Sequence, residues 1–319
     1  MTKESMDGKA LGPFRLAPWF SERPWGRRDL RPWYESTGTT ELVGEAWLTG
    51  PASVVETGRM AGQTLAAVVA SASAQVLGAG CGAEFPLLVK LLFPSDKLSV
   101  QVHPDDAQAQ AMGQPRGKTE CWYVLEADPE AAIALGLRDG ATAEVVRAAI
   151  ADGTMEEWME WVPVQVGDMV FVDAGTVHAI GPGVVLLETQ QTCDITFRMY
   201  DYGRPRELHV EQALRVMKMQ TAAGKVKPVQ MDGFMRLIQQ KYFVVDRYDI
   251  SEGREVVIPI DEAGCLVGLD GSAMVETAGA PSVELPRGQA VVVPAGLGSV
   301  IVRSKETASF VRCFAPAEK

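Results

Sequence analysis

The sequence predicts an all-β protein built from two related barrel units, with a helical insertion in the first unit. Short apolar runs rich in β-branched and aromatic residues recur along the chain and are bounded by Gly and Pro, as in an antiparallel sandwich or barrel. One stretch of the first half also returns in the second half at a constant spacing. At 319 residues the chain is long enough for two domains with a large buried core.

Seven runs in the first two thirds of the chain have the composition of strands. They are "ELVGEAWLTG", "FPLLVKLLFP", "KLSVQVHP", "ECWYVLE", "DMVFVDAG", "GVVLLETQQ" and "CDITFRMYD". The pattern breaks between residues 138 and 162, where "ATAEVVRAAIADG" has helical spacing and "TMEEWMEW" places Thr154 and Glu157 in a capping-box relation. We therefore expect a helical insertion there, and a second helix at "LHVEQALRVMKM", residues 208–219.

The repeat joins "VPVQVGDMVFVDAGTVHAI", residues 162–180, to "VELPRGQAVVVPAGLGSV", residues 283–300. Both read as a turn with Gly and a polar residue, then an apolar strand, then Ala-Gly. Gly288 follows Gly167 by 121 positions, and the same offset pairs His178 with Ser299. A repeat of this size predicts two related β units. The first keeps a residue able to bind a metal, and the second has lost it.

These patterns divide the chain into an N-terminal catalytic domain, residues 1–220, and a degenerate C-terminal domain, residues 221–319, with "TAAGKVKPVQMDG" as the linker. The formal net charge of -11 argues against nucleic acid and anionic membrane surfaces as partners. No apolar run has the length of a membrane span, and the N-terminus lacks the apolar segment of a secretory signal. Five Cys without a C-x-x-C pair read as free thiols, so we expect a cytoplasmic protein.

The stretch "LSVQVHPDD" places Gln101 and His103 on the same face of a predicted strand, since side chains alternate with a period of two. Glu120 begins the strand "ECWYVLE", and His178 follows the turn "DAGTVHAI". These four residues form a set of nitrogen and oxygen ligands on neighbouring strands, all able to point into one barrel. The third histidine, His209, precedes a helix and is expected to make local hydrogen bonds instead.

The motifs "FPLLVKLL", "LSVQVHPDD", "GKTECWYVL", "AGTVHAIGPG" and "ETQQTCDITFRMYDYGR" together resemble the type I mannose-6-phosphate isomerases of the cupin superfamily, in their short bacterial form. The resemblance is close over residues 40–217 and weak in the C-terminal unit. It implies two jelly-roll cupin units. It also implies a catalytic pocket with one zinc ion per chain, and the residues concerned are Gln101, His103, Glu120 and His178 for the metal and Lys118, Asp194 and Arg198 for the substrate.

The implied reaction converts mannose 6-phosphate and fructose 6-phosphate into each other through a cis-enediol. A metal can polarise the oxygens at C1 and C2, and Arg198 can share the charge that develops there. The base that takes the C2 proton stays open between Lys118, Asp194 and a water on the metal. Arg198, Arg204 and Lys97 are candidates for holding the phosphate.

Two other functions fit part of the same set. His103, Glu120 and His178 alone form the two-histidine, one-carboxylate arrangement of iron oxygenases, which makes a cupin oxygenase an alternative. A sugar-binding cupin without catalysis would keep the ligands and need no proton relay. Gln101 as a fourth ligand, with Lys118 and Arg198 nearby, favours the sugar-phosphate isomerase.

Overall fold

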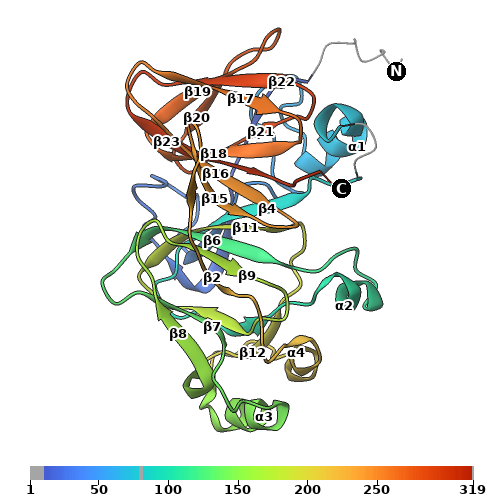
Figure 1. The fold of residues 1–319 in the computed structure, drawn as a ribbon, viewed down its shortest axis with the longest axis vertical. Coiled ribbons are helices and arrows are strands. Elements are labelled where there is room, and N and C mark those ends of the chain that lie inside the picture. The colour runs from blue at the N-terminus through green and yellow to red at the C-terminus, as the bar shows by residue number, and fades with distance from the viewer. Residues whose placement is uncertain (1–10, 79–81, 318–319) are drawn as a thin grey trace.

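The computed structural model describes residues 11–78 and 82–317, which form two β-sandwiches stacked back to back in four layers (Figure 1). The first sandwich pairs sheet I, in the order β12-β5-β10-β7-β8, with sheet II, in the order β13-β9-β6-β11-β4-β3-β2. The second pairs sheet III, in the order β1-β21-β18-β23-β16-β15-β14, with sheet IV, in the order β17-β22-β19-β20. The strands within the sheets pair in antiparallel fashion, and the all-β prediction is confirmed.

The strands of the first sandwich come from the first 226 residues. Those of sheet I are β5 (Val100–Val102), β7 (Ala132–Leu137), β8 (Met159–Pro163), β10 (His178–Ile180) and β12 (Phe197–Tyr200). Those of sheet II are β2 (Trp19–Arg27), β3 (Val43–Trp47), β4 (Leu87–Leu92), β6 (Glu120–Ala127), β9 (Met169–Val172), β11 (Val184–Gln191) and β13 (Gly224–Val226).

The second sandwich is built from the C-terminal third and one N-terminal strand. Sheet III holds β1 (Phe14–Leu16), β14 (Val229–Gln230), β15 (Met235–Gln239), β16 (Val244–Ile250), β18 (Gly264–Asp270), β21 (Ala290–Val293) and β23 (Ala308–Phe314). Sheet IV holds β17 (Glu255–Ile260), β19 (Ser272–Glu276), β20 (Val283–Pro286) and β22 (Gly298–Arg303).

The repeat is visible in the topology of the two sandwiches. Four neighbouring strands of sheet II, β9-β6-β11-β4, have the same connectivity as four neighbouring strands of sheet III, β21-β18-β23-β16. Strand β21 begins and ends 121 positions after β9. The paired turn glycines Gly167 and Gly288 both have positive φ, 91° and 74°, which L-amino acids with a side chain rarely adopt. The two units therefore share one architecture.

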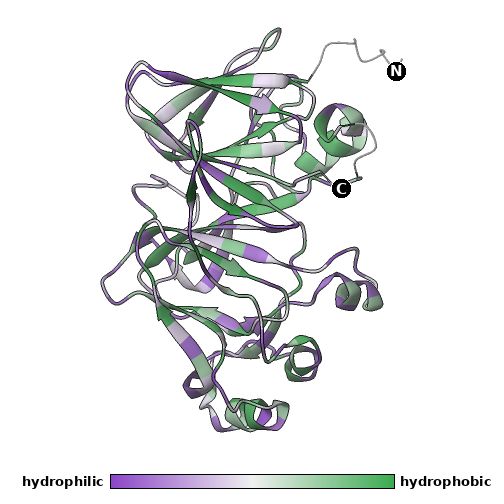
Figure 2. Cartoon of the chain, in the orientation of Figure 1, coloured by the Kyte–Doolittle hydropathy of each residue, from purple (hydrophilic) through white to green (hydrophobic). Residues whose placement is uncertain are grey.

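The predicted match of His178 to Ser299 is wrong at the level of side-chain direction. His178 is buried inside the first sandwich, whereas Ser299 is exposed and its neighbours Val300 and Val302 point into the second core. Because side chains alternate along a strand, a difference of one residue after the shared turn reverses which side chains face inward. The second interior is filled by apolar side chains such as Val300 and Phe310, in the strands shown mainly green in Figure 2.

Four α-helices and one 3-10 helix complete the described chain: α1 (Leu65–Val76), α2 (Asp106–Ala111), α3 (Ala143–Asp152), η1 (Met155–Trp158) and α4 (Val210–Val216). The helices expected at 138–162 and 208–219 are present as α3 with η1 and as α4. The predicted capping box is absent, since the Thr154 side chain makes no cap hydrogen bond, and the segment continues as β8 instead of a helix.

Separate buried clusters hold the layers together. Between sheets II and III, Leu91 of β4, Leu187 of β11 and Val245 of β16 belong to one apolar core that also includes α1, so the two units share an extensive interface. A second cluster fills the first sandwich, and a third fills the second sandwich. Helices α3 and α4 cover the outer face of sheet I, where Val100 and Val102 pack against them, so the apolar face of the predicted strand is buried as expected.

The division of the chain at residue 220 stays a prediction, and strand pairing adds detail to it. Strand β1 joins β21 in sheet III, so the N-terminal segment contributes to the second sandwich. In the expected linker, β13 pairs with β9 of sheet II and β14 pairs with β15 of sheet III, which places the crossing between the units at residues 227–228. Within the described residues, no helix combines the length and apolar character needed to cross a membrane.

Candidate metal centre and active site

The interior of the first sandwich is apolar over much of its length and polar at one end. The apolar part surrounds Trp122, Ile133 and Leu186, which are fully buried. The charged or titratable side chains buried at the polar end are Lys90, His103, Lys118, Glu120, His178 and Glu188. Burying such groups costs free energy unless they are paired with one another or bind an ion. This end of the sandwich is therefore the candidate site.

Sheet I presents three predicted site residues side by side. His178 on β10 lies opposite Gln101 on β5, and Gln101 lies opposite Arg198 on β12. Residues directly opposite each other on antiparallel strands project from the same face of the sheet. Since Val100 and Val102 pack under the helices on the outer face, Gln101 and its two partners face the interior.

The turn before β10 brings the two histidines together. Gly175 has a φ of 93°, and its backbone N–H donates to the carbonyl oxygen of His103 at 2.9 Å. A residue with a side chain is strained at this φ, so the Ala-Gly sequence suits the turn. The ring centroids of His103 and His178 consequently lie 4.8 Å apart, although the two residues are far apart along the chain.

Both imidazole rings are held by backbone carbonyls at Nδ1. His103 Nδ1 lies 2.8 Å from the carbonyl oxygen of Ile195, and His178 Nδ1 lies 2.9 Å from that of Thr176. A neutral ring that donates from Nδ1 keeps the lone pair of Nε2 free, which is the arrangement found in histidine metal ligands. Both Nε2 atoms lie near the Glu120 carboxylate, at 3.7 Å for His103 and 3.4 Å for His178.

The pKa values of both histidines favour the neutral form. Burial lowers the pKa of His178 to about 4, with the charge of Lys118 acting in the same direction. Burial and the Lys118 charge also lower the pKa of His103 well below its ordinary value. Metal ligands must be unprotonated, so these rings are in the state that can bind an ion near neutral pH.

Glu120 faces the histidines from sheet II, where it begins β6 opposite Gln190 and Val172. The Glu120 side chain is fully buried, and neither carboxylate oxygen makes a hydrogen bond to any part of the chain that the structure describes. Lys118 Nζ lies 2.8 Å from Glu120 Oε2, which is an ion-pair distance without hydrogen-bond geometry. The same Nζ lies 3.2 Å from His103 Nε2.

These donors fit a bound divalent metal. The ligand atoms of His103, Glu120 and His178 all lie within 4.8 Å of one another, and the two carboxylate oxygens are buried without hydrogen bonds among the described residues. Two imidazole nitrogens and a carboxylate match the ligand preferences of zinc and of iron. Gln101 lies at the same point, since its Nε2 is 3.2 Å from His178 Nε2. A rotation of the amide by 180° exchanges its nitrogen and oxygen, so Gln101 can also offer an oxygen.

Asp194 lies beside this group and belongs to a charge network that the sequence only partly indicated. Lys90 Nζ lies 3.2 Å from Asp194 Oδ1 and 3.3 Å from Glu188 Oε1. Trp122 Nε1 donates to the other oxygen of Glu188 at 3.2 Å. Burial raises the pKa of Glu188. Burial alone would lower the pKa of Lys90, but Glu188 and the other nearby carboxylates outweigh it and raise that pKa.

Lys90 and Glu188 were not predicted as site residues. A signal for them was present, because each is a charged residue within a strand that is otherwise apolar, in "FPLLVKLLFP" and "GVVLLETQQ". A lysine at 3% and a glutamate at 5% exposure need each other as partners. Only the pairing of β4 with β11, which sets Lys90 opposite Glu188, shows that the two charges meet.

Arg198 reaches the site from β12 and keeps one donor unused. Its Nη1 donates to the carbonyl oxygen of Glu207 at 2.7 Å, whereas its Nε is buried and has no hydrogen-bond partner among the described residues. His209 supports this strand, because its backbone N–H donates to the carbonyl oxygen of Arg198 at 2.7 Å and its Nδ1 accepts from the Arg198 backbone N–H at 3.3 Å. The expectation that His209 makes local hydrogen bonds at the start of the helix is wrong, because its side chain makes no cap hydrogen bond to α4 and bonds instead to Arg198, 11 residues earlier on β12.

The other two candidates for holding phosphate, Lys97 and Arg204, lie near the N-terminal end of β5, whereas His103 follows its C-terminal end. Lys97 Nζ pairs with Glu156 at 2.7 Å and lines an open cavity of about 770 Å³ together with Trp161. Arg204 donates to the carbonyl oxygen of Lys97 through Nη2. Its Nη1 is buried and has no hydrogen-bond partner in the described chain, although the Asp201 carboxylate lies 3.7 Å away.

The chain is similar to known sugar-phosphate enzymes in sequence and in structure. The family described as "Phosphomannose isomerase type I, catalytic domain" matches residues 14–142. "Mannose-6-phosphate isomerase" of Streptococcus mutans is 36% identical over 252 residues, covering 75% of this chain and 79% of the relative. "Mannose-6-phosphate isomerase ManA" of Bacillus subtilis is 35% identical over 254 residues, covering 75% and 80%. The solved mannose 6-phosphate isomerase of Bacillus subtilis superposes with a TM-score of 0.85 at 30% identity, covering 95% of this chain and 99% of the other.

Proposed function

Because the chain belongs to the type I phosphomannose isomerase family, we propose that it converts mannose 6-phosphate and fructose 6-phosphate into each other. The observation that carries the proposal is the convergence of His103, Glu120 and His178 on one point, with Lys118 beside them. The oxygenase and the non-catalytic sugar-binding protein are less favoured, since the relatives are named as isomerases and the site also holds the charges that proton transfer needs.

The metal in this proposal is one zinc ion held by Gln101, His103, Glu120 and His178. Support comes from the free Nε2 positions of both rings and from the two Glu120 oxygens, which have no hydrogen bond within the described chain. When bound, such an ion polarises oxygens of the sugar and stabilises the negative charge that develops on them. A set without thiolate ligands suits zinc and also admits other divalent metals, so the metal content of the purified protein has to be measured.

Exposure to solvent favours Asp194 over Lys118 as the group that takes the C2 proton. The Asp194 side chain is 50% exposed, so a sugar entering the site can reach its carboxylate. Lys118 is 3% exposed and already lies between Glu120 and His103. Asp194 is therefore proposed as the base that takes the C2 proton, while the Lys118 ammonium donates a hydrogen bond to a sugar oxygen as charge builds on it.

Arg198 is proposed to bind an anionic part of the substrate. Its position opposite Gln101 directs it into the site, and its unused Nε is a buried donor that a phosphate or an enediolate oxygen could satisfy. Arg204, with its buried Nη1, is a second candidate for the phosphate. Lys97 is a weaker candidate, because its ammonium is already paired with Glu156.

We also place the protein in the cytoplasm. The four cysteines for which the structure gives a state, Cys121, Cys193, Cys265 and Cys313, are free thiols, as expected in a reducing compartment.

A coupled assay on mannose 6-phosphate, with the metal removed and then restored, tests the proposed function directly. We expect turnover that disappears after chelation and returns when zinc is added. Absence of turnover in the metal-loaded protein at any substrate concentration would contradict the proposal.

A further inference from the structure

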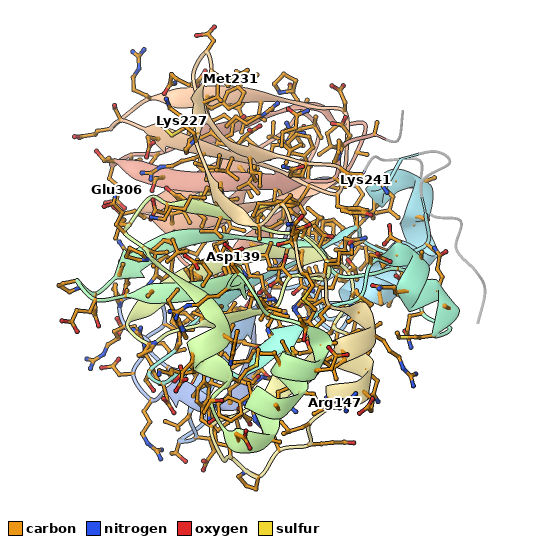
Figure 3. The ribbon with its side chains drawn as sticks, turned by 60° about the horizontal axis from the view of Figure 1, so that its bottom comes forward. Asp139, Arg147, Lys227, Met231, Lys241 and Glu306 are labelled. Carbon is orange, nitrogen blue, oxygen red and sulfur yellow. The ribbon has the colours of Figure 1, made fainter. Side chains whose placement is uncertain are left out.

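A tyrosine of the second sandwich forms a hydrogen bond close to the catalytic segment of the first. Tyr242 lies in the turn of the β15–β16 hairpin, next to Lys241, which Figure 3 labels. Its hydroxyl donates to Oδ2 of Asp106, the first residue of α2, at 2.5 Å. The next residue, Phe243, is fully buried in the core between sheets II and III. Its burial fixes the position of the hairpin turn that carries Tyr242.

The Asp106 carboxylate that accepts from Tyr242 is also hydrogen-bonded to the segment that carries Lys118. Its other oxygen, Oδ1, accepts from the backbone N–H of Gly117 at 2.9 Å and from Gln191 Nε2 at 3.0 Å. The Oε1 of Gln191 in turn accepts from the backbone N–H of Thr119 at 2.9 Å. One carboxylate therefore connects the second sandwich, the end of β11 and the approach to β6.

The segment 117–119 is held by all three of its backbone N–H groups. Gly117 donates to Asp106, Lys118 donates to the carbonyl oxygen of Pro104 at 3.0 Å, and Thr119 donates to Gln191. At Gly117 the chain passes so close to the turn after β5 that a Cβ would lie 2.5 Å from the Pro104 oxygen. Residues 111–115 are exposed and Arg116 is half-buried, so these contacts fix the chain where it passes from the surface into the site.

Asp106 is ionised near neutral pH, which strengthens the hydrogen bonds that hold segment 117–119. Burial would raise the pKa of Asp106, but hydrogen bonds from Tyr242, Gln191 and Gly117 outweigh it and lower that pKa. Asp106 is therefore a carboxylate near neutral pH and accepts all three bonds at once. Hydrogen bonds to an ionised acceptor are stronger than those between neutral groups.

We propose that Asp106 and Tyr242 are positioning residues, which hold segment 117–119 so that Lys118 Nζ lies beside Glu120 and His103. The inference rests on the proposed isomerase function. The second sandwich, whose own interior is apolar, would then contribute to catalysis through the Tyr242 hydroxyl, with Lys241 of the same hairpin 3.8 Å from the same Asp106 oxygen. Gln101, Glu120 and His178 have ladder partners of their own, and His103 is held by its backbone contact with Gly175 and its ring contact with Ile195. Loss of the contact should therefore disturb Lys118 more than the metal.

The test compares Tyr242→Phe, Asp106→Ala and Asp106→Asn with the wild-type protein in the metal-loaded form. We expect Tyr242→Phe to lower kcat about 10-fold and Asp106→Ala about 30-fold or more, as for other residues that orient catalytic groups. KM and the metal content should stay near the wild-type values. Asp106→Asn keeps an oxygen for Gly117 and Gln191, and its amide N–H can donate to the Tyr242 hydroxyl oxygen, so the contact persists with its direction reversed. This variant should therefore keep kcat within about threefold of wild type.

Tyr248→Phe is the matched control, because it removes a hydroxyl from a buried tyrosine of the second sandwich that stacks between Phe234 and Phe310. This variant should keep the wild-type kcat. If the wild-type protein isomerises the substrate and Tyr242→Phe has an unchanged kcat, the inference is wrong and the proposed function stands. If the wild-type protein shows no isomerase activity, the proposed function itself fails. A loss of metal in Tyr242→Phe that parallels the loss of kcat would also overturn the positioning role.

Discussion

His178 Nε2 lies 3.4 Å from Glu120 Oε1, although the two residues belong to opposite sheets of the first sandwich. The contact joins β10 of sheet I to β6 of sheet II at the polar end of the interior. If both atoms bind one ion, His178→Ala should remove the metal as well as the activity. Metal analysis of the purified protein should give about one divalent ion per wild-type chain and much less in the variant. A variant that retains a full complement of metal would show that His178 is not a ligand.

The second sandwich should hold no metal, because its interior is packed with apolar side chains. Ser299, which the sequence repeat paired with His178, is exposed on β22. Ser299→Ala should therefore leave kcat, KM and the metal content unchanged. A second equivalent of metal that survives in His178→Ala and disappears when Ser299→Ala is added would contradict this expectation.

Arg198→Ala should lower kcat on the order of 100-fold, if the guanidinium faces charge that develops in the transition state. The metal content should stay normal, because arginine is not a metal ligand. If Arg198 only holds the phosphate, the loss should appear mainly in KM and should affect substrate and phosphorylated inhibitors alike. Steady-state kinetics separate the two results, and unchanged kcat with unchanged KM would place Arg198 outside the working site.

Asp194→Asn should reduce kcat by roughly 100-fold or more, since an amide cannot accept the C2 proton. The Lys90 contact can persist, because the amide keeps one oxygen. Exchange of the C2 hydrogen with solvent deuterium, followed by NMR on the sugar, should slow by a similar factor. If exchange continues at the wild-type rate, another group is the base.

Lys90→Ala should destabilise the fold as well as the site. The variant leaves Glu188 buried at 5% exposure without the cation that lies 3.3 Å from it, and breaking a buried pair in this way typically costs about 3–5 kcal/mol. Denaturant unfolding should show the loss. The substitution Lys225→Ala breaks a more exposed ion pair with Asp168, so it is a suitable comparison and should cost less than about 1 kcal/mol.

Much of this protein could be predicted from the sequence, where local patterns decide the outcome. The period of two placed Gln101 and His103 together, and the Ala-Gly turn marked the start of the strand with His178, because strand alternation and positive φ depend on a few neighbouring residues. The motifs identified the family, and the helices α3 and α4 were found from their spacing. The local signal failed at Thr154, where a capping-box sequence lies before a short 3-10 helix, and the following residues pair with β7 as a strand.

The tertiary structure decided the features that depend on which strands become neighbours. The contact of Lys90 with Glu188 requires β4 to pair with β11, and the outward direction of Ser299 follows from its strand register, which the repeat misjudged by one residue. Tyr242 and Asp106 are 136 positions apart along the chain, and they meet only because sheets II and III pack back to back around a shared apolar core. Packing between distant segments depends on contacts made across the whole chain, so no short stretch of sequence specifies which strands and sheets become neighbours.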